Sequence, residues 1–269
     1  MSRQGRPTLD ARDDEARLFD AHCHLDWFAH PTRVAREADA AGLDVLAVTV
    51  TPEGWRTAAG ELAGCPNVAL AAGLHPWWAA NGHCGEHDVD ELCRAVEDQR
   101  LVGEVGLDRS RGRDAPDAWS AQAAAFERVC AAAAGASAAG APRVLSIHSA
   151  CAATDVLDVL ERTGAAGCCR CVLHWFSGST PELWRAVRAG CWFSFGERSL
   201  ATGRGREYAR LVPAARLLTE TDLPAAAGDK GGAATLVDSV GRTLDGLARA
   251  RGADVRALVA QNARALLGD

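Results

Sequence analysis

Two histidines separated by one residue lie near the start of the chain, in the stretch LFDAHCHLD at residues 18–26. In an extended strand, alternate side chains point to the same face, so His22 and His24 would present two imidazoles together. Imidazole nitrogens are common ligands of divalent metal ions. The pair indicates part of a metal site, although two histidines at this spacing also occur as ordinary core or surface residues. The rest of the chain must supply the other ligands.

Four more residues with ligand chemistry lie at or near the ends of short apolar runs. They are Glu104, His148, His174 and Asp222. Each has an ordinary explanation, because strand-end histidines are often only hydrogen-bonded and an aspartate before a proline commonly starts a turn. Their repeated placement favours one shared site instead. Such a His-rich set suits Zn, Mn or Fe.

The elements that would position these ligands are eight short apolar runs, mostly separated by helical patterns. The runs are residues 18–22, 45–50, 68–74, 101–107, 143–148, 171–175, 191–195 and 216–221. Buried strands that alternate with helices predict a parallel sheet, and eight such units in about 250 residues predict an α/β fold of the (β/α)8 TIM barrel type. A doubly wound open sheet is the alternative. The helical pattern is weakest between the second and third runs.

A (β/α)8 barrel places its functional side chains at the C-terminal ends of the strands. Glu104 lies late in the fourth run, His148 ends the fifth, and His174 lies near the end of the sixth. Asp222 follows the eighth run directly. Together with the histidine pair of the first run, six ligands are expected on one rim of the barrel.

The composition limits the classes of protein and of partner. The chain has 269 residues, 48% of them hydrophobic, and a net charge of −6. This charge argues against a general nucleic-acid coat, so any nucleic-acid contact must be local. Ten scattered cysteines without a disulfide framework indicate reduced thiols and a cytoplasmic location, and no apolar run is long enough to span a membrane. We expect residues 1–17 to be a flexible leader and residues 18–269 to form a single barrel domain.

Seven motifs, taken in order, resemble the TatD family of metal-dependent deoxyribonucleases, which are (β/α)8 barrels of the amidohydrolase superfamily. They are FDAHCHLD, AAGLHP, VGEVGLD, VLSIHS, LHWFSGS, CWFSFG and LLTETDLP. The resemblance extends from Leu18 to the closing residues 262–267. Within the family, the stretches VTVTPEGW, HWFSGS and GCWFSFGERSL are most similar to the QatD-type nuclease of the Qat anti-phage system.

The resemblance implies a site for two divalent metal ions, with Mg or Mn as the catalytic metal and Zn as an alternative. His22, His24 and Asp222 would hold one ion. His148 and His174 would hold the second, and Glu104 would bridge the two.

The resemblance also implies roles for residues around the metals. Asp222 is the expected general base for the attacking water, while His75 matches a histidine near the substrate phosphate. The alternative for His75 is that it only fixes the turn before Pro76. Asp108 and Glu220 match acidic residues near the site, and we expect Glu220 to orient a ligand and not to bind metal.

Substrate contacts are expected from aromatic and basic residues that follow the strands. The tryptophans in such positions are Trp27, Trp55, Trp77, Trp78 and Trp175, and the arginines are Arg109, Arg111, Arg113, Arg198, Arg204 and Arg206. From these we select Trp77, Trp175, Arg109 and Arg198 as substrate contacts, since bases stack on tryptophan and arginine binds phosphate. Tryptophans that only plug the barrel and solvated loop arginines are the ordinary alternatives. Many family members carry a basic residue shortly after the fifth-strand histidine, where this chain has Ala150 and Cys151.

Three functions compete on this evidence. The first is a metal-dependent nuclease that removes nucleotides from single-stranded DNA ends, with a role in anti-phage defence. The second is another hydrolase on the same barrel, an amidohydrolase or a phosphotriesterase. Those enzymes usually bridge their metals with a carbamylated lysine, and here no lysine lies on a predicted strand. The third is a low-activity binding subunit of a defence complex, with protein partners.

Overall fold

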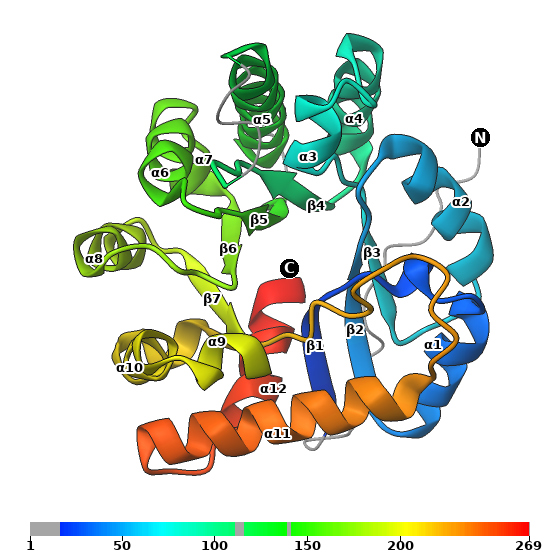
Figure 1. The fold of residues 1–269 in the computed structure, drawn as a ribbon, viewed down its shortest axis with the longest axis vertical. Coiled ribbons are helices and arrows are strands. Elements are labelled where there is room, and N and C mark those ends of the chain that lie inside the picture. The colour runs from blue at the N-terminus through cyan, green and yellow to red at the C-terminus, as the bar shows by residue number, and fades with distance from the viewer. Residues whose placement is uncertain (1–16, 111–115, 139–140, 269) are drawn as a thin grey trace.

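A computed structural model describes residues 17–110, 116–138 and 141–268. Eight parallel strands alternate with helices along this part of the chain (Figure 1). One run of paired strands contains β1 (Leu18–Cys23), β2 (Leu43–Val48) and β3 (Val68–Ala71). The other contains β4 (Leu101–Gly106), β5 (Val144–His148), β6 (Arg170–His174), β7 (Trp192–Phe195) and β8 (Leu217–Thr219). All eight coincide with the predicted apolar runs.

Two junctions join these runs into a ring. Between β3 and β4, an isolated parallel bridge pairs Ala72 with Val102. Between β8 and β1, the Thr219 hydroxyl donates to the Phe19 carbonyl, and the Asp222 N–H donates to the His22 carbonyl at 2.9 Å. The strands therefore follow one another around a circle in sequence order, which is the predicted (β/α)8 arrangement.

Apolar side chains fill both faces of the strand ring. The inner cluster contains Phe19, Leu46, Val172 and Leu218, together with Leu266 near the end of the chain. A second and larger cluster lies between the strands and the surrounding helices. Burial on both faces explains why the strands are almost continuously apolar in sequence.

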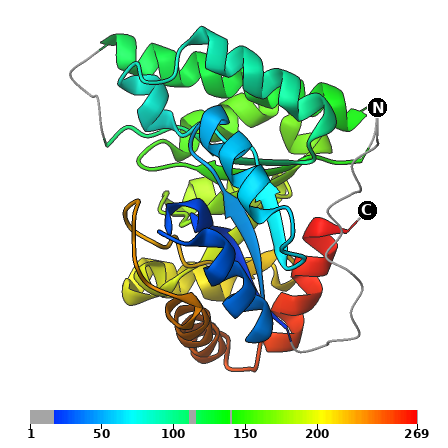
Figure 2. The same ribbon diagram turned by 90° about the vertical axis from the view of Figure 1, so that its right-hand side faces the viewer.

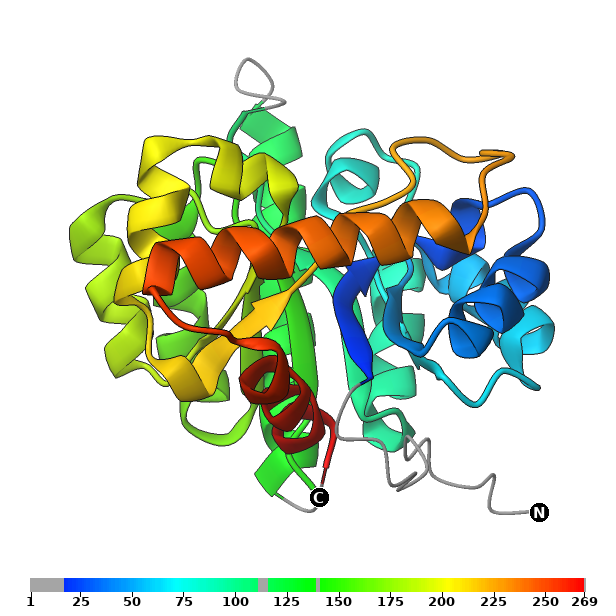
Figure 3. The same ribbon diagram turned by 90° about the horizontal axis from the view of Figure 1, so that it is seen from below.

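The helices surround the ring and leave the strand ends free for the site. Those on the first half of the chain are α1 (Pro31–Ala40), α2 (Pro52–Leu62), α3 (Pro76–Ala80), α4 (Glu86–Asp98) and α5 (Pro116–Ala138). The second half adds α6 (Ala153–Arg162), α7 (Ala165–Cys168), α8 (Thr180–Arg188), α9 (Glu197–Ala201), α10 (Gly203–Leu211), α11 (Ala233–Arg251) and α12 (Arg256–Leu267). Short 3-10 turns cover Leu25–Trp27 and Ala214–Arg216. The long helix α5 packs beside α4 (Figure 2), and α11 and α12 both pack against β1 and β8 (Figure 3).

The link between β2 and β3, where the helical pattern is weakest, is the regular helix α2. Pro52 occupies its first turn, and the Thr51 hydroxyl accepts the Gly54 N–H at 3.0 Å. Proline at the first helical position and a threonine cap are strong start signals. The capping residues thus define this helix where the hydrophobic pattern does not.

Most of the predicted leader lies outside the described residues. Its last residue, Arg17, belongs to the folded domain, because its guanidinium pairs with Asp39 at 2.9 Å and with Asp44 at 2.7 Å. The ten cysteines all lie in described residues and are free thiols. Among the described residues, no helix combines the length and apolar character needed to cross a membrane.

Candidate metal centre

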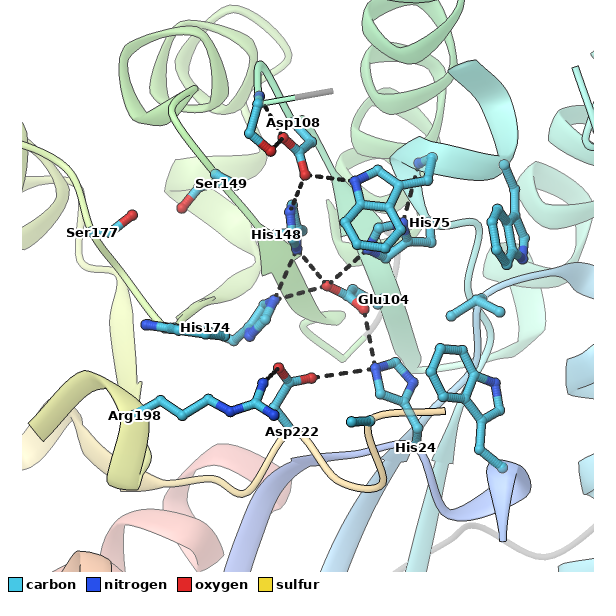
Figure 4. A pocket seen from close by; sticks show the side chains of 18 of the residues that line it. His24, His75, Glu104, Asp108, His148, Ser149, His174, Ser177, Arg198 and Asp222 are labelled. Carbon is cyan, nitrogen blue, oxygen red and sulfur yellow. Dashed lines mark hydrogen bonds and ion pairs between the residues drawn. The ribbon is translucent and has the colours of Figure 1, made fainter. Parts of the chain in front are cut away.

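A pocket of about 460 Å³ opens at the C-terminal ends of the strands. Five of the six predicted ligands line it, namely His24, Glu104, His148, His174 and Asp222 (Figure 4). His22 lies directly beneath them and is fully buried. The structure therefore brings all six side chains together on one rim, as the strand-end positions predict.

Glu104, near the end of β4, lies at the middle of the cluster. Its Oε1 is 2.8 Å from His148 Nδ1 and 2.8 Å from His174 Nε2. Its Oε2 is 3.5 Å from the Nε2 atoms of both His22 and His24. One carboxylate thus faces histidines from β1, β5 and β6, which is the position a bridging ligand requires.

Asp222 approaches the same histidines from the opposite side. Its Oδ1 lies 3.5 Å from His24 Nε2 and 3.8 Å from His22 Nε2. Its backbone has a φ of 56°, a left-handed value that aspartate tolerates better than most residues. This turn after β8 directs the carboxylate over the end of β1 (Figure 4).

Three overlapping groups of ligand atoms have internal separations within 4.8 Å. They are His22, His24 and Asp222; His22, Glu104 and His174; and His75, Glu104 and His148. The first group is the predicted set for one ion. The third adds His75, which was not predicted as a ligand, because its Nε2 lies 3.5 Å from Glu104 Oε1.

One buried imidazole nitrogen that faces the carboxylates lacks a hydrogen-bond partner, as expected of a ligand to a cation. Among the described residues, His22 Nε2, His24 Nδ1 and His174 Nδ1 are buried without a hydrogen-bond partner. Of these, His22 Nε2 faces the carboxylates of Glu104 and Asp222. Buried imidazole nitrogens opposite carboxylate oxygens are a donor set that suits a divalent metal ion.

The ionisation of the cluster also suits metal binding. Although burial opposes it, the neighbouring histidines, first His75 and His174, hold the pKa of Glu104 well below its usual range. Burial likewise opposes the shift at Asp222, but the hydrogen bond to His24 and nearby histidines lower its pKa to about 2. Burial lowers the pKa of His22 to about 4. At neutral pH the two acids are therefore anionic and His22 is neutral, which are the forms that bind metal.

His148 differs, because it lies between two acids. Burial opposes charge on the ring, yet hydrogen bonds to Asp108 and Glu104 raise its pKa to about 10. Its Nε2 lies 3.1 Å from Asp108 Oδ2 and its Nδ1 faces Glu104. Without a cation, His148 carries the proton that balances these carboxylates.

Outer residues fix the direction of the rings. Asp108 accepts the indole N–H of Trp77 at 2.6 Å as well as facing His148, and its pKa is depressed despite burial because of these hydrogen bonds. Ser146 Oγ lies 2.8 Å from His22 Nδ1 and leaves Nε2 directed at the carboxylates. Such contacts set the orientation of metal-binding imidazoles.

Glu220 lies beside the ligands and does not belong to any of the three groups. It accepts the Ser194 hydroxyl and the Trp175 N–H, and its Oε2 is 3.8 Å from His174 Nδ1. Burial raises the pKa of Glu220 well above its usual range. This position agrees with the expected orienting role.

Asp20 is a buried residue that the sequence reasoning did not single out. Its Oδ1 accepts the N–H groups of His22 at 3.1 Å and Thr221 at 3.0 Å, and its Oδ2 accepts the Thr221 hydroxyl at 2.6 Å. Burial raises the pKa of Asp20 to about 7. The residue ties the strand that carries the histidine pair to the turn that carries Asp222. An aspartate two residues before His22 is the signal that could have found it.

His75 fixes the turn before α3, and its position also leaves it facing the pocket. The Trp77 N–H donates to His75 Nδ1 at 3.1 Å, so the ring fixes the start of α3. The proton of the neutral ring is then on Nε2, which faces Glu104 and the pocket. Burial lowers the pKa of His75 and favours this neutral form.

Three of the four selected substrate residues line the pocket, and one does not. Trp77, Trp175 and Arg198 are in its wall, together with Trp27 and Trp78. Arg109 is not among the residues of the wall, and its expected contact with substrate stays a prediction. Its guanidinium pairs with Asp155 at 2.7 and 2.8 Å and lies 3.7 Å from the Trp119 ring centre, away from the described pocket wall.

Of the other residues considered for substrate contact, Trp55, Arg204 and Arg206 are not part of the pocket wall. Trp55 lies on α2 against the core, while Arg111 and Arg113 lie outside the described residues. Arg204 donates to the Ser177 carbonyl, and Arg206 donates to carbonyls at the end of α9. Among the described residues, Arg198 is the only arginine or lysine of the pocket wall.

A (β/α)8 fold with histidines, a glutamate and an aspartate gathered at its strand ends defines a metal-dependent hydrolase. Comparison with known families agrees with this class. Residues 19–268 match the family described as TatD related DNase. The chain therefore belongs to the TatD family.

Individual relatives support this assignment. The Mycobacterium tuberculosis protein described as "Uncharacterized metal-dependent hydrolase TatD" is 33% identical over 229 residues, which cover 77% of this chain and 80% of that protein. The Escherichia coli metal-dependent hydrolase YcfH is 29% identical over 224 residues and 77% of each chain. The crystal structure of YJJV, a TatD homologue from Escherichia coli, superposes with a TM-score of 0.76 at 22% identity, over 94% of this chain and 98% of that one.

Proposed function

We propose that this protein is a nuclease that hydrolyses phosphodiester bonds at the ends of single-stranded DNA, with two divalent metal ions as cofactors. One observation carries the proposal: four histidines and two carboxylates converge on the floor of a pocket whose walls hold four tryptophans and one arginine. The family description, TatD related DNase, supports DNA as the substrate.

The ligand set divides between two ions in a way that the contacts support. His22, His24 and Asp222 form one group within ligand distance, and His148 and His174 both face Glu104 Oε1. Glu104 directs its other oxygen to the first group and would be shared. Mg or Mn, or alternatively Zn, held by these residues would supply Lewis-acid polarisation of the phosphate and would lower the pKa of the attacking water.

Two residues of the chain are placed to move protons. The Asp222 side chain is 21% exposed, against 3% for Glu104, so of these two carboxylates it is the more accessible to a water in the pocket. It therefore serves as the general base. His75 carries its proton on Nε2, toward the pocket, and donates it to a phosphate oxygen or to the leaving group.

The size and walls of the pocket favour a single strand. A volume of about 460 Å³ is typical of a small-molecule site and accepts a terminal nucleotide more readily than a length of duplex. A base inside a duplex would first have to leave its stack, which costs a few kcal/mol. With a net charge of −6, the protein lacks the general attraction that retains long DNA, so we expect it to act at ends.

We further propose that the nuclease acts in the cytoplasm in anti-phage defence, together with protein partners. The support is the similarity of the stretches VTVTPEGW, HWFSGS and GCWFSFGERSL to the QatD-type nuclease. Cells that express the protein together with its proposed partners should lower the plating efficiency of a sensitive phage. Exchange of Glu104→Gln in the chromosome should remove that protection, and equal protection by the variant would contradict the role.

The nuclease activity is tested with the purified protein and an end-labelled oligonucleotide. We expect Mg²⁺ or Mn²⁺ to support shortening of the single strand, and His22→Ala or Glu104→Ala to abolish it. Turnover that persists after chelation, or in either variant, would overturn the proposal. A duplex of the same sequence and a matching RNA strand, assayed in parallel, define the substrate.

The same preparation tests the two alternatives. Hydrolysis of a paraoxon-like ester or a cyclic amide, without DNA cleavage, would identify another hydrolase of this barrel type. Bound metal without any turnover would favour a binding subunit. Glu104 at the bridging position weighs against the lysine-bridged hydrolases, because no lysine lies on a described strand.

A further inference from the structure

We infer that Trp175 is the surface on which the terminal base of the substrate stacks, an inference that rests on the proposed nuclease function. Four tryptophans line the pocket, and they differ in how far their rings are already engaged. A base needs an open aromatic face, since stacking is the contact that holds it regardless of sequence. The comparison of the four rings therefore identifies the one that is available.

Three of the rings are held by the metal centre or by the core. Trp27 is stacked on His24, with ring centres 4.4 Å apart and planes 16° apart. Trp77 donates its indole N–H to Asp108 and lies edge-on to His75 at 4.8 Å. Trp78 lies edge-on to His83 and packs against the hydrophobic core. These three shape the walls of the pocket.

Trp175 is the most exposed of the four tryptophans, and the group that lies over its ring is the exposed guanidinium of Arg198. Trp175 is 37% exposed, follows the ligand His174 directly, and has a φ of 42°. A left-handed φ is a costly conformation for a bulky aromatic residue. The Trp175 N–H donates to Glu220 Oε1 at 3.1 Å, which holds the backbone in that conformation. The hydrogen bond to Glu220 therefore stabilises an unfavourable backbone conformation that keeps a large apolar ring at the pocket mouth. Burial of the ring does not account for this position, because the ring is exposed.

Arg198 provides the polar half of the same surface. Its guanidinium carbon lies 5.5 Å from the Trp175 ring centre and one of its nitrogens lies 3.7 Å from Asp222 Oδ2. The side chain is 51% exposed and extends from α9 across the pocket (Figure 4). A base on Trp175 would therefore bring its neighbouring phosphate between an arginine and the metal ligands. After His148 and Ser149 this chain has Ala150 and Cys151 instead of a basic residue, so Arg198 supplies the positive charge of the described pocket wall.

The inference is tested by removing the ring and, separately, the base. Trp175→Leu and Trp175→Phe are compared with wild type on oligonucleotides that carry either a normal or an abasic terminal nucleotide, at the 5′ end or at the 3′ end. Trp184→Leu is the matched control, because Trp184 is similarly exposed at 39% but lies on α8 outside the described pocket wall. The readouts are kcat and KM.

We expect Trp175→Leu to raise KM roughly tenfold or more on the normal end and to leave the abasic end at the wild-type value. Trp175→Phe should retain most of the affinity, and Trp184→Leu should match wild type. If an abasic nucleotide at only one end of the oligonucleotide abolishes the KM difference between Trp175→Leu and wild type, that end is the one that occupies the pocket.

Equal losses on normal and abasic substrates, or no loss on either, would overturn the stacking role of Trp175 while leaving the nuclease function intact. Failure of the wild-type protein to cleave either oligonucleotide would overturn the proposed function and this inference with it. The activity of each variant on the abasic substrate also shows that the variant is folded.

Discussion

Asp108 contacts two residues that have different tasks in the pocket. It fixes the His148 ring through Nε2 and the Trp77 ring through the indole N–H. Its own carboxylate is held by the backbone N–H of Ser110 at 2.6 Å. At the scale of single residues, Asp108, which is not a predicted ligand, therefore fixes the orientation of the ligand His148 and of Trp77 in the pocket wall.

Asp108→Asn should weaken metal binding. The amide is uncharged and stabilises the His148 ring less well, and loss of such an outer contact lowers metal affinity by about 10- to 100-fold. Calorimetric titration of the metal-free protein with Mn²⁺ measures the change. Asp90→Asn, which removes an exposed acid paired with Arg128, is the control. Equal affinities for both variants would contradict the role of Asp108.

Metal uptake should release a proton from His148. In the metal-free protein the raised pKa of about 10 keeps this ring protonated at neutral pH, and its Nδ1 must lose the proton to bind a cation. The apparent affinity should therefore increase with pH, by up to about tenfold per unit between roughly pH 7 and 9. Calorimetric metal titrations in buffers of different ionisation enthalpy measure how many protons the protein releases when it binds metal. Affinity that is constant over this interval would rule out the protonated state of His148.

At the scale of elements, the close approach of β2, β3 and β4 depends on Gly73, just after β3. A Cβ on this residue would lie 1.8 Å from the Thr49 carbonyl oxygen and 2.5 Å from the Glu104 nitrogen. These atoms are backbone and have little room to move. The absence of a side chain at Gly73 therefore lets the strand that carries Glu104 pass beside its neighbours.

Gly73→Ala should be strongly destabilising, by about 3 kcal/mol or more, because the new methyl overlaps fixed backbone atoms. Gly60→Ala is the matched control, for which we expect the opposite change in the free energy of unfolding. Gly60 is exposed within α2 and has open space around it, so alanine should stabilise the protein by about 0.5–1 kcal/mol. Urea unfolding of both variants measures the difference. A loss of less than about 1 kcal/mol in the unfolding free energy of Gly73→Ala would contradict the predicted overlap with the backbone.

The eight strands and the six ligands could be predicted because both follow from local patterns. Buried strands are apolar runs, and a parallel barrel aligns their ends. Helix α2 was not clear because only Pro52, Ala58 and Leu62 of its residues are buried, so it has little hydrophobic pattern. Its start is set by the Thr51 cap instead.

The direction of the Arg109 side chain and the contacts of Asp20 could not be predicted, for a different reason. Both residues follow local rules, but their side chains are directed by partners far away in the sequence. Arg109 turns to Asp155, 46 residues further on, and Asp20 bonds Thr221, 201 residues further on. Such tertiary contacts cannot be read from spacing along the chain.

At the scale of the whole molecule, metal binding should stabilise the fold. The ligands come from β1, β4, β5, β6 and the turn after β8, so a bound cation connects both runs of paired strands. Metal at about 100 times its Kd contributes about 2.7 kcal/mol, which corresponds to a rise in Tm of about 5–10 °C for a chain of this size. Scanning calorimetry before and after chelation measures it. The Glu104→Ala variant should show a much smaller shift, and an unchanged Tm in wild type would contradict the prediction.

The junction between β8 and β1 has a consequence for the synthesis of the protein. The histidine pair leaves the ribosome early, whereas the turn with Asp222 follows about 200 residues later. At about 5–20 residues per second, this interval is roughly 10 to 40 seconds. Throughout it the nascent chain has histidines but no complete centre. All six proposed ligands are therefore present only when translation is nearly finished, and a chain that ends before residue 222 lacks one of them.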